Sequence, residues 1–372
     1  MPTPTEAQIR KALATVIDPE IRRPITDLDM VESIEVGPAG AVTVEILLTV
    51  PGCPLKDQLE ADVKRALAAL GGVGLVTVRL GVMDAPRRQA LMDKLRGGPA
   101  KAVPFAQPAS RTAVIAIASG KGGVGKSSVA ANLAVAFADL GYAVGVLDAD
   151  IQGFSMPRML GVETDPTQVG DSVLPPVARG VKVFSMGMLV PPGQPVVWRG
   201  PVLHRAVSQF LTDVVWGDLD VLLIDLPPGT GDVPLSIGQL IPGAALVVVT
   251  TPQPAAAEVA QRAGALALQT KQPILGVVEN MSWLETPDGG RLAIFGEGGG
   301  ARVAANLSEA SGVEVPLLAQ IPLDQAVREG GDAGEPVVLA APASAAAVAL
   351  REVAAKLARA ERLSGRTPGG AD

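Results

Sequence analysis

The sequence predicts an α/β protein in which a doubly wound, mostly parallel sheet is preceded by a small α+β domain. Hydrophobic residues make up 48% of the chain but aromatic residues only 3%, so a core must consist mostly of Val, Leu, Ile and Ala, as in parallel sheets covered by helices. Short apolar runs also alternate with helical stretches over the C-terminal two thirds of the chain, which is the rhythm of βαβ units. The length of 372 residues accommodates roughly two or three domains of about 150 residues each.

The pattern of residues 1–95 predicts the small α+β domain. In "AVTVEILL", Val42, Val44 and Ile46 alternate onto one face, as a half-buried strand requires. Farther along, Leu59 and Val63 belong to a series of apolar residues at helical spacing. In chain order, the predicted elements are a helix near 5–16, strands near 30–36 and 41–48, a helix near 55–70 and a strand near 74–80.

Residues 96–111 have the composition of a linker. They contain glycines and three prolines but no apolar period, which favours extended backbone. We therefore expect the second domain to span 112–360, followed by a disordered tail over 361–372. In its last helix, Leu350, Val353 and Leu357 share one face, so we expect this helix to dock on the domain, a membrane-surface helix being the alternative.

The predicted strands of the second domain are "TAVIAIAS", "YAVGVLD", "DVLLIDLP", "ALVVVTT" and "ILGVVEN". Ligands of doubly wound sheets bind outside the carboxyl ends of the strands, so functional residues are expected just after each strand.

Composition excludes several classes of function. With 38 acidic and 31 basic residues and no run of Lys and Arg, we expect no nucleic-acid partner. The charged start of the chain and the lack of a long apolar run predict a cytoplasmic protein with no membrane partner. The sequence contains one Cys, Cys53, and one His, His204, which excludes an internal disulfide and argues against a structural zinc site. A metal cluster would require a second subunit.

A glycine-rich segment, "GKGGVGKS", matches the phosphate-binding pattern G-x-x-x-x-G-K-[ST]. It also fits the dinucleotide pattern G-x-G-x-x-G, with Asp148 and Asp150 near the place of a ribose-binding acid. Lys126 and Ser127 favour the first pattern, because a triphosphate needs a cation on its β- and γ-phosphates and a hydroxyl on magnesium. We therefore predict that ATP and Mg²⁺ bind here, the nucleotide contacting Gly120, Lys121, Gly122, Gly123, Val124, Gly125, Lys126 and Ser127.

Acidic residues after two other predicted strands complete this interpretation. Asp225 ends the strand in "VLLIDLPPGTGD", where a carboxylate holds magnesium through water, and Gly229 and Gly231 allow a turn that senses the γ-phosphate. Asp148 and Asp150 end another strand. One of them orients the attacking water or assists the metal, or both are solvent-facing loop acids.

Together these segments resemble the Mrp-type iron–sulfur cluster carriers. The resemblance covers about 112–340 through "GKGGVGKSS", "LDADIQG", "VVWRGP", "IDLPPGTGD", "VVENMS", "IFGEGGG" and "IPLD". It places the second domain among the deviant Walker P-loop ATPases, together with partitioning and septum-site ATPases. The first domain resembles, through "TVPGCPL", the cluster-assembly domain often fused ahead of these ATPases.

The resemblance implies a homodimeric Mg-dependent ATP hydrolase, slow without its client, that delivers iron–sulfur clusters to apoproteins. Lys121 then reaches the partner's phosphates and neutralises transition-state charge in trans, as an arginine finger does. Lys126 and Asp150 complete the implied catalytic set, with Asp150 orienting the water. Asn280 is implied to hydrogen-bond the adenine.

One feature of these relatives is missing. Many carry a C-x-x-C pair shortly after "ENMS", and two pairs meeting across the dimer supply four thiolates to a cluster. This chain has instead "WLETPDGGRLAIFGEGGG", which predicts a hairpin turning at 287–290. An ATP-gated scaffold that docks assembly factors without holding a cluster is therefore the alternative function.

Cys53 is the one thiol available to hold a cluster. Pro54 follows it at a predicted helix start, where a thiol pKa is lowered. Cys53 is thus either an iron–sulfur ligand or client-docking residue, or a small side chain packed at a helix end.

Overall fold

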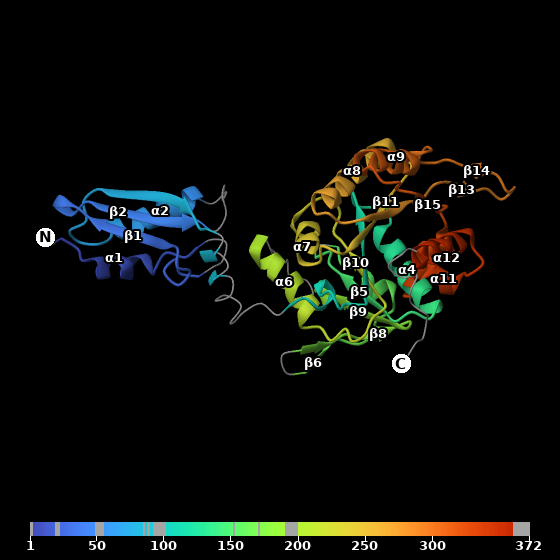
Figure 1. The fold of residues 1–372 in the computed structure, drawn as a ribbon, viewed down its shortest axis with the longest axis horizontal. Helices are drawn as coiled ribbons and strands as arrows, with labels where there is room; N and C mark the ends of the chain where they lie inside the picture. The colour runs from blue at the N-terminus through green and yellow to red at the C-terminus, as the bar shows by residue number, and fades with distance from the viewer. Residues whose placement is uncertain are drawn as a thin grey trace. The chain divides into compact units, whose positions relative to one another are not determined.

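The computed structural model describes residues 3–18, 23–48, 56–84, 86–87, 90–91, 102–151, 153–169, 172–189 and 200–359. The chain forms two compact units, Met1–Lys101 and Ala102–Asp372 (Figure 1). Cys53, like the predicted tail, lies outside the described residues.

The first unit is a three-stranded sheet packed against two helices. Its central strand, β2 (Val42–Leu48), is antiparallel to β1 (Val31–Val36) and parallel to β3 (Val76–Val82). The helices are α1 (Glu6–Leu13) and α2 (Lys56–Ala68), whose Ile9 and Val63 are fully buried against the alternating apolar face of β2. The five elements predicted for this domain are confirmed.

An eight-stranded sheet forms the centre of the second unit, in the order β15-β12-β11-β4-β10-β5-β9-β8. Seven strands run parallel, and β8 at the edge is antiparallel to β9. The five central strands are those predicted from the sequence. The strand bounds are β4 (Ala113–Ser119), β5 (Val144–Asp148), β8 (Val177–Ala178), β9 (Val181–Ser185), β10 (Val221–Asp225), β11 (Ala245–Thr250), β12 (Ile274–Glu279) and β15 (Leu317–Gln320).

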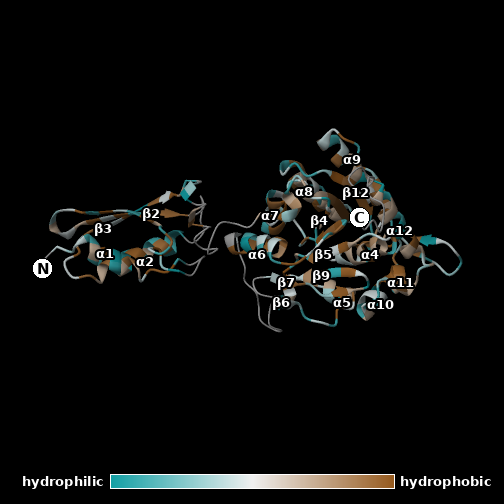
Figure 2. Ribbon diagram, turned by 60° about the horizontal axis from the view of Figure 1, so that its bottom comes forward, coloured by the Kyte–Doolittle hydropathy of each residue, from teal (hydrophilic) through white to brown (hydrophobic). Residues whose placement is uncertain are grey.

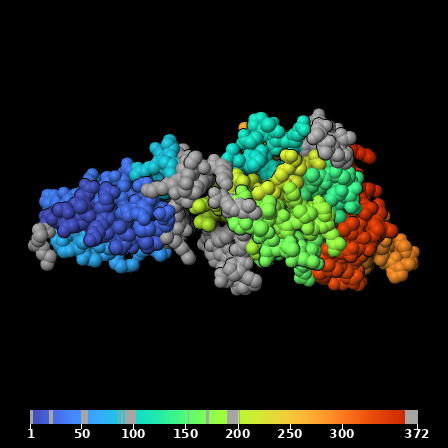
Figure 3. All heavy atoms as spheres, turned by 90° about the horizontal axis from the view of Figure 1, so that it is seen from below, coloured from blue at the N-terminus to red at the C-terminus, as the bar shows by residue number. Residues whose placement is uncertain are grey.

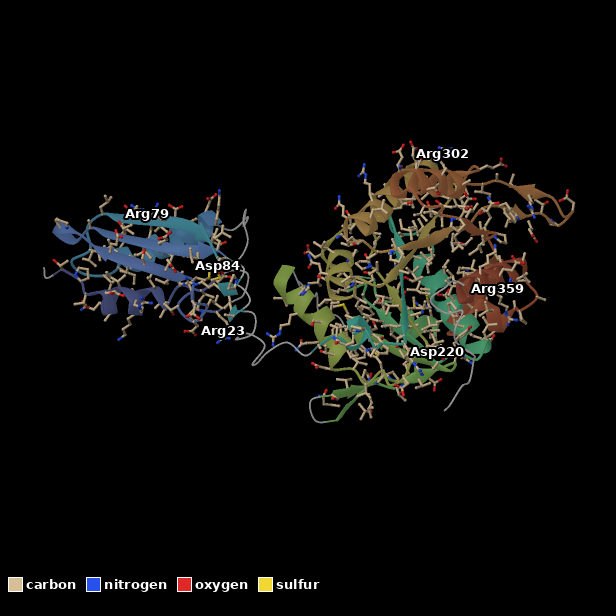
Figure 4. All side chains as sticks on the ribbon, in the orientation of Figure 1. Arg23, Arg79, Asp84, Asp220, Arg302 and Arg359 are labelled. Carbon is tan, nitrogen blue, oxygen red and sulfur yellow. The ribbon has the colours of Figure 1, made fainter. Side chains whose placement is uncertain are left out.

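Helices cover both faces of this sheet, as a doubly wound fold requires. One face is covered by α6 (Gly200–Thr212), α7 (Asp232–Leu240), α8 (Pro254–Gln269) and α9 (Gly299–Ser311). The other face is covered by α4 (Lys126–Asp139), α5 (Met156–Met159), α10 (Gln325–Ala333), α11 (Val337–Ala340) and α12 (Ala345–Ala358). Hydrophobic residues concentrate in the strands (Figure 2), and buried apolar residues of the helices pack against them. By contrast, Arg302 of α9 and Arg359 after α12 are exposed (Figure 4).

The predicted linker extends too far into the second unit. Residues 102–111 belong to that unit, and Pro104–Ala106 form a 3₁₀ helix. Phe105 is 9% exposed and packs edge-on against Trp216, with ring centroids 6.5 Å apart. The lone aromatic residue of the segment has no periodic neighbours, so sequence pattern did not reveal that it is buried.

A hairpin projects from the sheet after β12, as the sequence predicted (Figures 1 and 3). Its strands β13 (Leu284–Glu285) and β14 (Arg291–Leu292) are antiparallel, and Arg291 stacks over the Trp283 ring at 4.0 Å. At the base of the hairpin, the buried Glu279 carboxylate accepts hydrogen bonds from both ends of the segment 282–300: from Ser282 Oγ at 3.0 Å and from Gly300 N at 2.5 Å.

Among the described residues, no helix combines the length and the apolar character needed to cross a bilayer.

The substitution Phe105→Ala tests whether residues 102–111 are integral to the second unit. We expect a loss of about 3 kcal/mol in the free energy of unfolding, because a buried aromatic side chain and its packing are removed. The measurement is guanidinium-induced unfolding followed by tryptophan fluorescence, which reports on this unit because Trp198, Trp216 and Trp283 all belong to it. Leu292→Ala, at a 54% exposed position, is the control and should cost less than about 0.5 kcal/mol. Equal unfolding midpoints for the two variants would mean that Phe105 contributes no packing.

Candidate nucleotide-binding site

The glycine-rich segment connects β4 to α4 at the carboxyl edge of the sheet. Gly123 and Gly125 have φ values of +81° and +80°, a left-handed conformation that glycine adopts without strain. Gly120 lies directly against α8, where an added Cβ would come within 2.1 Å of the Val259 carbonyl carbon. Nothing lies within 4 Å of a Cβ built at Gly123, so the loop is open on that side. The result is a backbone cradle before a helix N-terminus, which favours phosphate.

A cluster of three side chains, the buried Lys126 and Asp225 and the half-buried Ser127, lies beneath this cradle. Lys126 Nζ is 2.6 Å from Asp225 Oδ1, and Ser127 Oγ donates to Asp225 Oδ2 at 2.6 Å. Lys126 is 6% exposed and Asp225 1%. Burial raises the pKa of Asp225 above its usual value, whereas the Lys126 charge and the hydrogen bonds from Lys126 and Ser127 act to lower it. A hydroxyl and a carboxylate are hard oxygen donors, so this pair fits Mg²⁺.

The two carboxylates after β5 have different surroundings. Asp148 is fully buried and accepts hydrogen bonds from Ser155 N and Met156 N at 3.0 and 3.1 Å, and from Ser185 Oγ at 3.1 Å. Asp150 is 9% exposed, accepts from Gly153 N at 3.0 Å and faces the cavity at the loop. The alternative of solvent-facing loop acids is therefore wrong for both. Asp148 organises the following turn, whereas Asp150 is available to the cavity.

Burial also raises the pKa of Asp148, to about 6, and the adjacent Asp225 adds to this effect. The two residues are register partners on neighbouring strands β5 and β10. Three backbone amides oppose the shift but do not cancel it.

Lys121 does not join the Lys126–Asp225 cluster but contacts the start of α8. Its Nζ donates to Gln253 Oε1 at 2.8 Å, at the start of α8. Nearby, the amide of Gly229 donates to Ser119 O at 2.8 Å, which joins the predicted sensing turn to the end of β4.

Two adjoining cavities are lined in part by the glycine-rich loop. One, of about 250 Å³, is lined by the glycine-rich segment, Asp150 and Pro228. The second, of about 220 Å³, shares Gly125 with the first and is also lined by Asn280 and the 322–324 segment. Asn280 Nδ2 donates to Val124 O at 2.9 Å, so this side chain contacts the loop backbone directly.

The one histidine, His204, lies on α6, and its Nδ1 is 3.0 Å from Ser236 Oγ of α7, so it joins these two helices. Within the described ranges, no group of three or more His, Cys, Asp or Glu side chains is arranged to hold a metal ion.

Sequence reasoning missed Gln253 at this edge of the sheet. Gln253 follows β11, and the rule that ligand-binding residues follow strands could have identified it. Sequence reasoning did name Asp148 but not its structural role, which depends on backbone amides of the following turn and on Ser185.

Comparison with known proteins identifies relatives of both units. Residues 110–358 match the model of the NUBPL iron-transfer P-loop NTPase family, and residues 6–78 match that of the iron-sulfur cluster assembly protein family. The iron-sulfur cluster carrier protein of Mycobacterium tuberculosis is 59% identical over 94% of this chain and 92% of its own length.

Solved structures resemble the second unit. A nucleotide-binding protein from Archaeoglobus fulgidus, in complex with ADP, is 39% identical, with a TM-score of 0.51 over 59% of this chain and 85% of that chain. The cell division ATPase MinD of Pyrococcus furiosus is 26% identical, with a TM-score of 0.50 over 67% of this chain and 99% of that chain.

The raised pKa of Asp148 predicts a pH dependence of stability. The folded chain retains this proton up to about pH 6, whereas the unfolded chain releases it near 3.8. The contribution of Asp148 to stability therefore falls as the pH rises from about 4 to about 6, by on the order of 2 to 3 kcal/mol. The measurement is the difference in unfolding free energy between wild type and Asp148→Asn at pH 4 and pH 7, by denaturant titration. A difference that stays flat, or that increasingly favours wild type at pH 7, would contradict this electrostatic account.

Proposed function

The chain belongs to the family of iron-transfer P-loop NTPases, and from this membership we propose that it is a homodimeric, Mg²⁺-dependent ATP hydrolase that delivers iron–sulfur clusters to apoproteins. The observation that carries the hydrolase proposal is the cluster of Lys126, Ser127 and Asp225 beneath the glycine-rich loop.

In this proposal the loop amides of 120–127 and the Lys126 ammonium bind the phosphates of ATP. Both groups are hydrogen-bond donors at the N-terminus of α4, and a helix N-terminus favours anions. Ser127 and Asp225 would hold Mg²⁺, which neutralises charge on the β- and γ-phosphates when bound. A phosphate group also gives Lys126 an anionic partner other than Asp225, so binding exchanges one ionic contact for another.

The second cavity is proposed to take the nucleoside. It adjoins the loop through Gly125, and Asn280 presents an amide there, a group able to hydrogen-bond a purine. The A. fulgidus relative, in complex with ADP, supports an adenine nucleotide as the ligand.

Asp150 and Lys121 are proposed to act in hydrolysis. Asp150 faces the phosphate cavity and would orient the attacking water as a hydrogen-bond acceptor. Lys121 is not part of the Lys126–Asp225 pair and contacts α8 instead. We propose that it stabilises transition-state charge in the site of a second copy, which makes hydrolysis depend on dimerisation.

The cysteine content of the chain bears directly on the cargo. The chain contains one cysteine, so a dimer offers two Cys53 thiolates and a cluster must take its other ligands from a client, a partner or a small thiol. This single thiol favours a second candidate function, an ATP-gated scaffold that binds assembly factors or clients without carrying a cluster.

Lys121→Ala tests the trans role. We expect kcat for ATP to fall roughly 100-fold or more, because a cation opposite the transferred phosphoryl group is lost. ATP binding should change little, since Lys126 and the loop amides remain. Phosphate release gives kcat, and titration with a fluorescent ATP analogue gives the dissociation constant. Lys64→Ala, on the exposed face of α2, is the matched control and should retain full turnover. Wild-type turnover in a monomeric Lys121→Ala protein would refute the trans role.

Anaerobic reconstitution with iron and sulfide tests the cargo. In the carrier function, wild type binds iron with a visible charge-transfer spectrum, and Cys53→Ser loses both while its ATP hydrolysis is unchanged. If neither protein binds iron while both hydrolyse ATP, the scaffold function is correct. Loss of hydrolysis in Cys53→Ser would instead indicate a damaged fold.

A further inference from the structure

Lys121 lies beside α8 because of a close backbone contact one residue earlier. The missing Cβ of Gly120 lets β4 end directly against the Val259–Ala260 backbone of α8. The next residue, Lys121, therefore emerges next to the N-terminus of that helix, where its Nζ meets Gln253 Oε1 at 2.8 Å.

Gln253 is itself held in a fixed position. It is the N-cap residue of α8, with φ −58° and ψ +130°, and lies between Pro252 and Pro254. Its carbonyl oxygen accepts from Ala256 N and Ala257 N at 3.0 and 3.1 Å. The backbone of Gln253 is thus anchored by the helix that it begins, and its side-chain amide is presented from a rigid base.

The contact with Lys121 is weak by its chemistry. The Gln253 side chain is a neutral acceptor, so it satisfies one ammonium proton without neutralising the charge. The ammonium also lies near a helix N-terminus, whose dipole disfavours cations. A phosphate oxygen is anionic and would replace the amide with a stronger, charge-assisted partner.

The loop has the freedom that such an exchange requires. Lys121 and Gln253 are half-buried rather than enclosed. The residues after Lys121 are Gly122 and Gly123, both exposed, and Gly123 has open space around it.

We infer that Gln253 is a positioning residue that keeps Lys121 within its own protomer, in competition with the phosphates bound by a second copy of the chain. This rests on the trans role proposed above for Lys121. The Gln253 amide thus sets a threshold for dimerisation. A stronger contact within the protomer would prevent Lys121 from moving to the second copy, whereas without any contact Lys121 would be free to bind the second copy's phosphates at lower protein concentration.

The first test measures the cis contact alone. Limited acylation with an N-hydroxysuccinimide ester, quantified by peptide mass spectrometry, gives the reactivity of Lys121 relative to exposed Lys64 in the same chain. Gln253→Ala should raise the relative reactivity of Lys121 several-fold. Gln253→Glu should lower it, because a carboxylate forms an ion pair and is also favoured at a helix N-terminus. Equal Lys121 reactivity in the three proteins would overturn the inference.

The second test measures the consequence with ATP, by sedimentation over a concentration series. Gln253→Ala should dimerise at roughly a hundredfold lower concentration than wild type, because each of the two protomers loses one hydrogen bond to a charged group and each loss contributes about tenfold. Gln253→Glu should dimerise at higher concentration than wild type. In a Lys121→Ala background the Gln253→Ala substitution should have no effect. An effect that persists there would reveal a packing role and overturn the inference.

The two tests separate this inference from the function on which it rests. If wild type and all variants stay monomeric with ATP, the trans role of Lys121 is wrong. The proposed competition between Gln253 and the second copy's phosphates is then wrong as well. The acylation result would still decide whether Gln253 restrains Lys121.

Discussion

The buried ion pair between Lys126 and Asp225 is the interaction on which the second unit depends most. Taking both charges out of water carries a desolvation cost of several kcal/mol per ion, and their attraction offsets it only with good geometry and further hydrogen bonds. Here the geometry is good, at 2.6 Å, and Ser127 satisfies the second carboxylate oxygen. The pair joins the first turn of α4 to the end of β10, and so aligns the loop with the central strands.

A second carboxylate lies beside this pair on the neighbouring strand, and its surroundings separate its role from that of Asp225. Asp148 accepts hydrogen bonds from the turn that follows β5, so its burial supports backbone rather than a ligand. Asp150, two residues later, faces the cavity. Three acids at one sheet edge thus have three different environments: an ion pair, a ring of hydrogen-bond donors and an accessible cavity wall.

Local patterns predicted most of this, and contacts between distant segments account for the rest. The central strands, the glycine-rich loop and the hairpin each have a pattern within a short run of sequence, and all were predicted. The outer strands β8, β9 and β15 were not predicted. The strands β8 and β15 are short, and the apolar run of β9 is interrupted by Lys182, whose ammonium donates to Trp216 O. The contact between Lys121 and Gln253 spans 132 residues, so it becomes visible only when β4 and α8 are packed together.

The carboxylate of Glu279 has a consequence for what the segment after β12 can tolerate. Because it hydrogen-bonds to Ser282 and Gly300, the segment between them begins and ends at one side chain. Closing a loop costs entropy that rises only slowly with its length, so a base of this kind accepts inserts of different size and chemistry. We therefore expect a longer or chemically different segment between Ser282 and Gly300 to leave β12 and the glycine-rich loop in place. This segment can then gain new contacts without altering the carboxyl edge of the sheet.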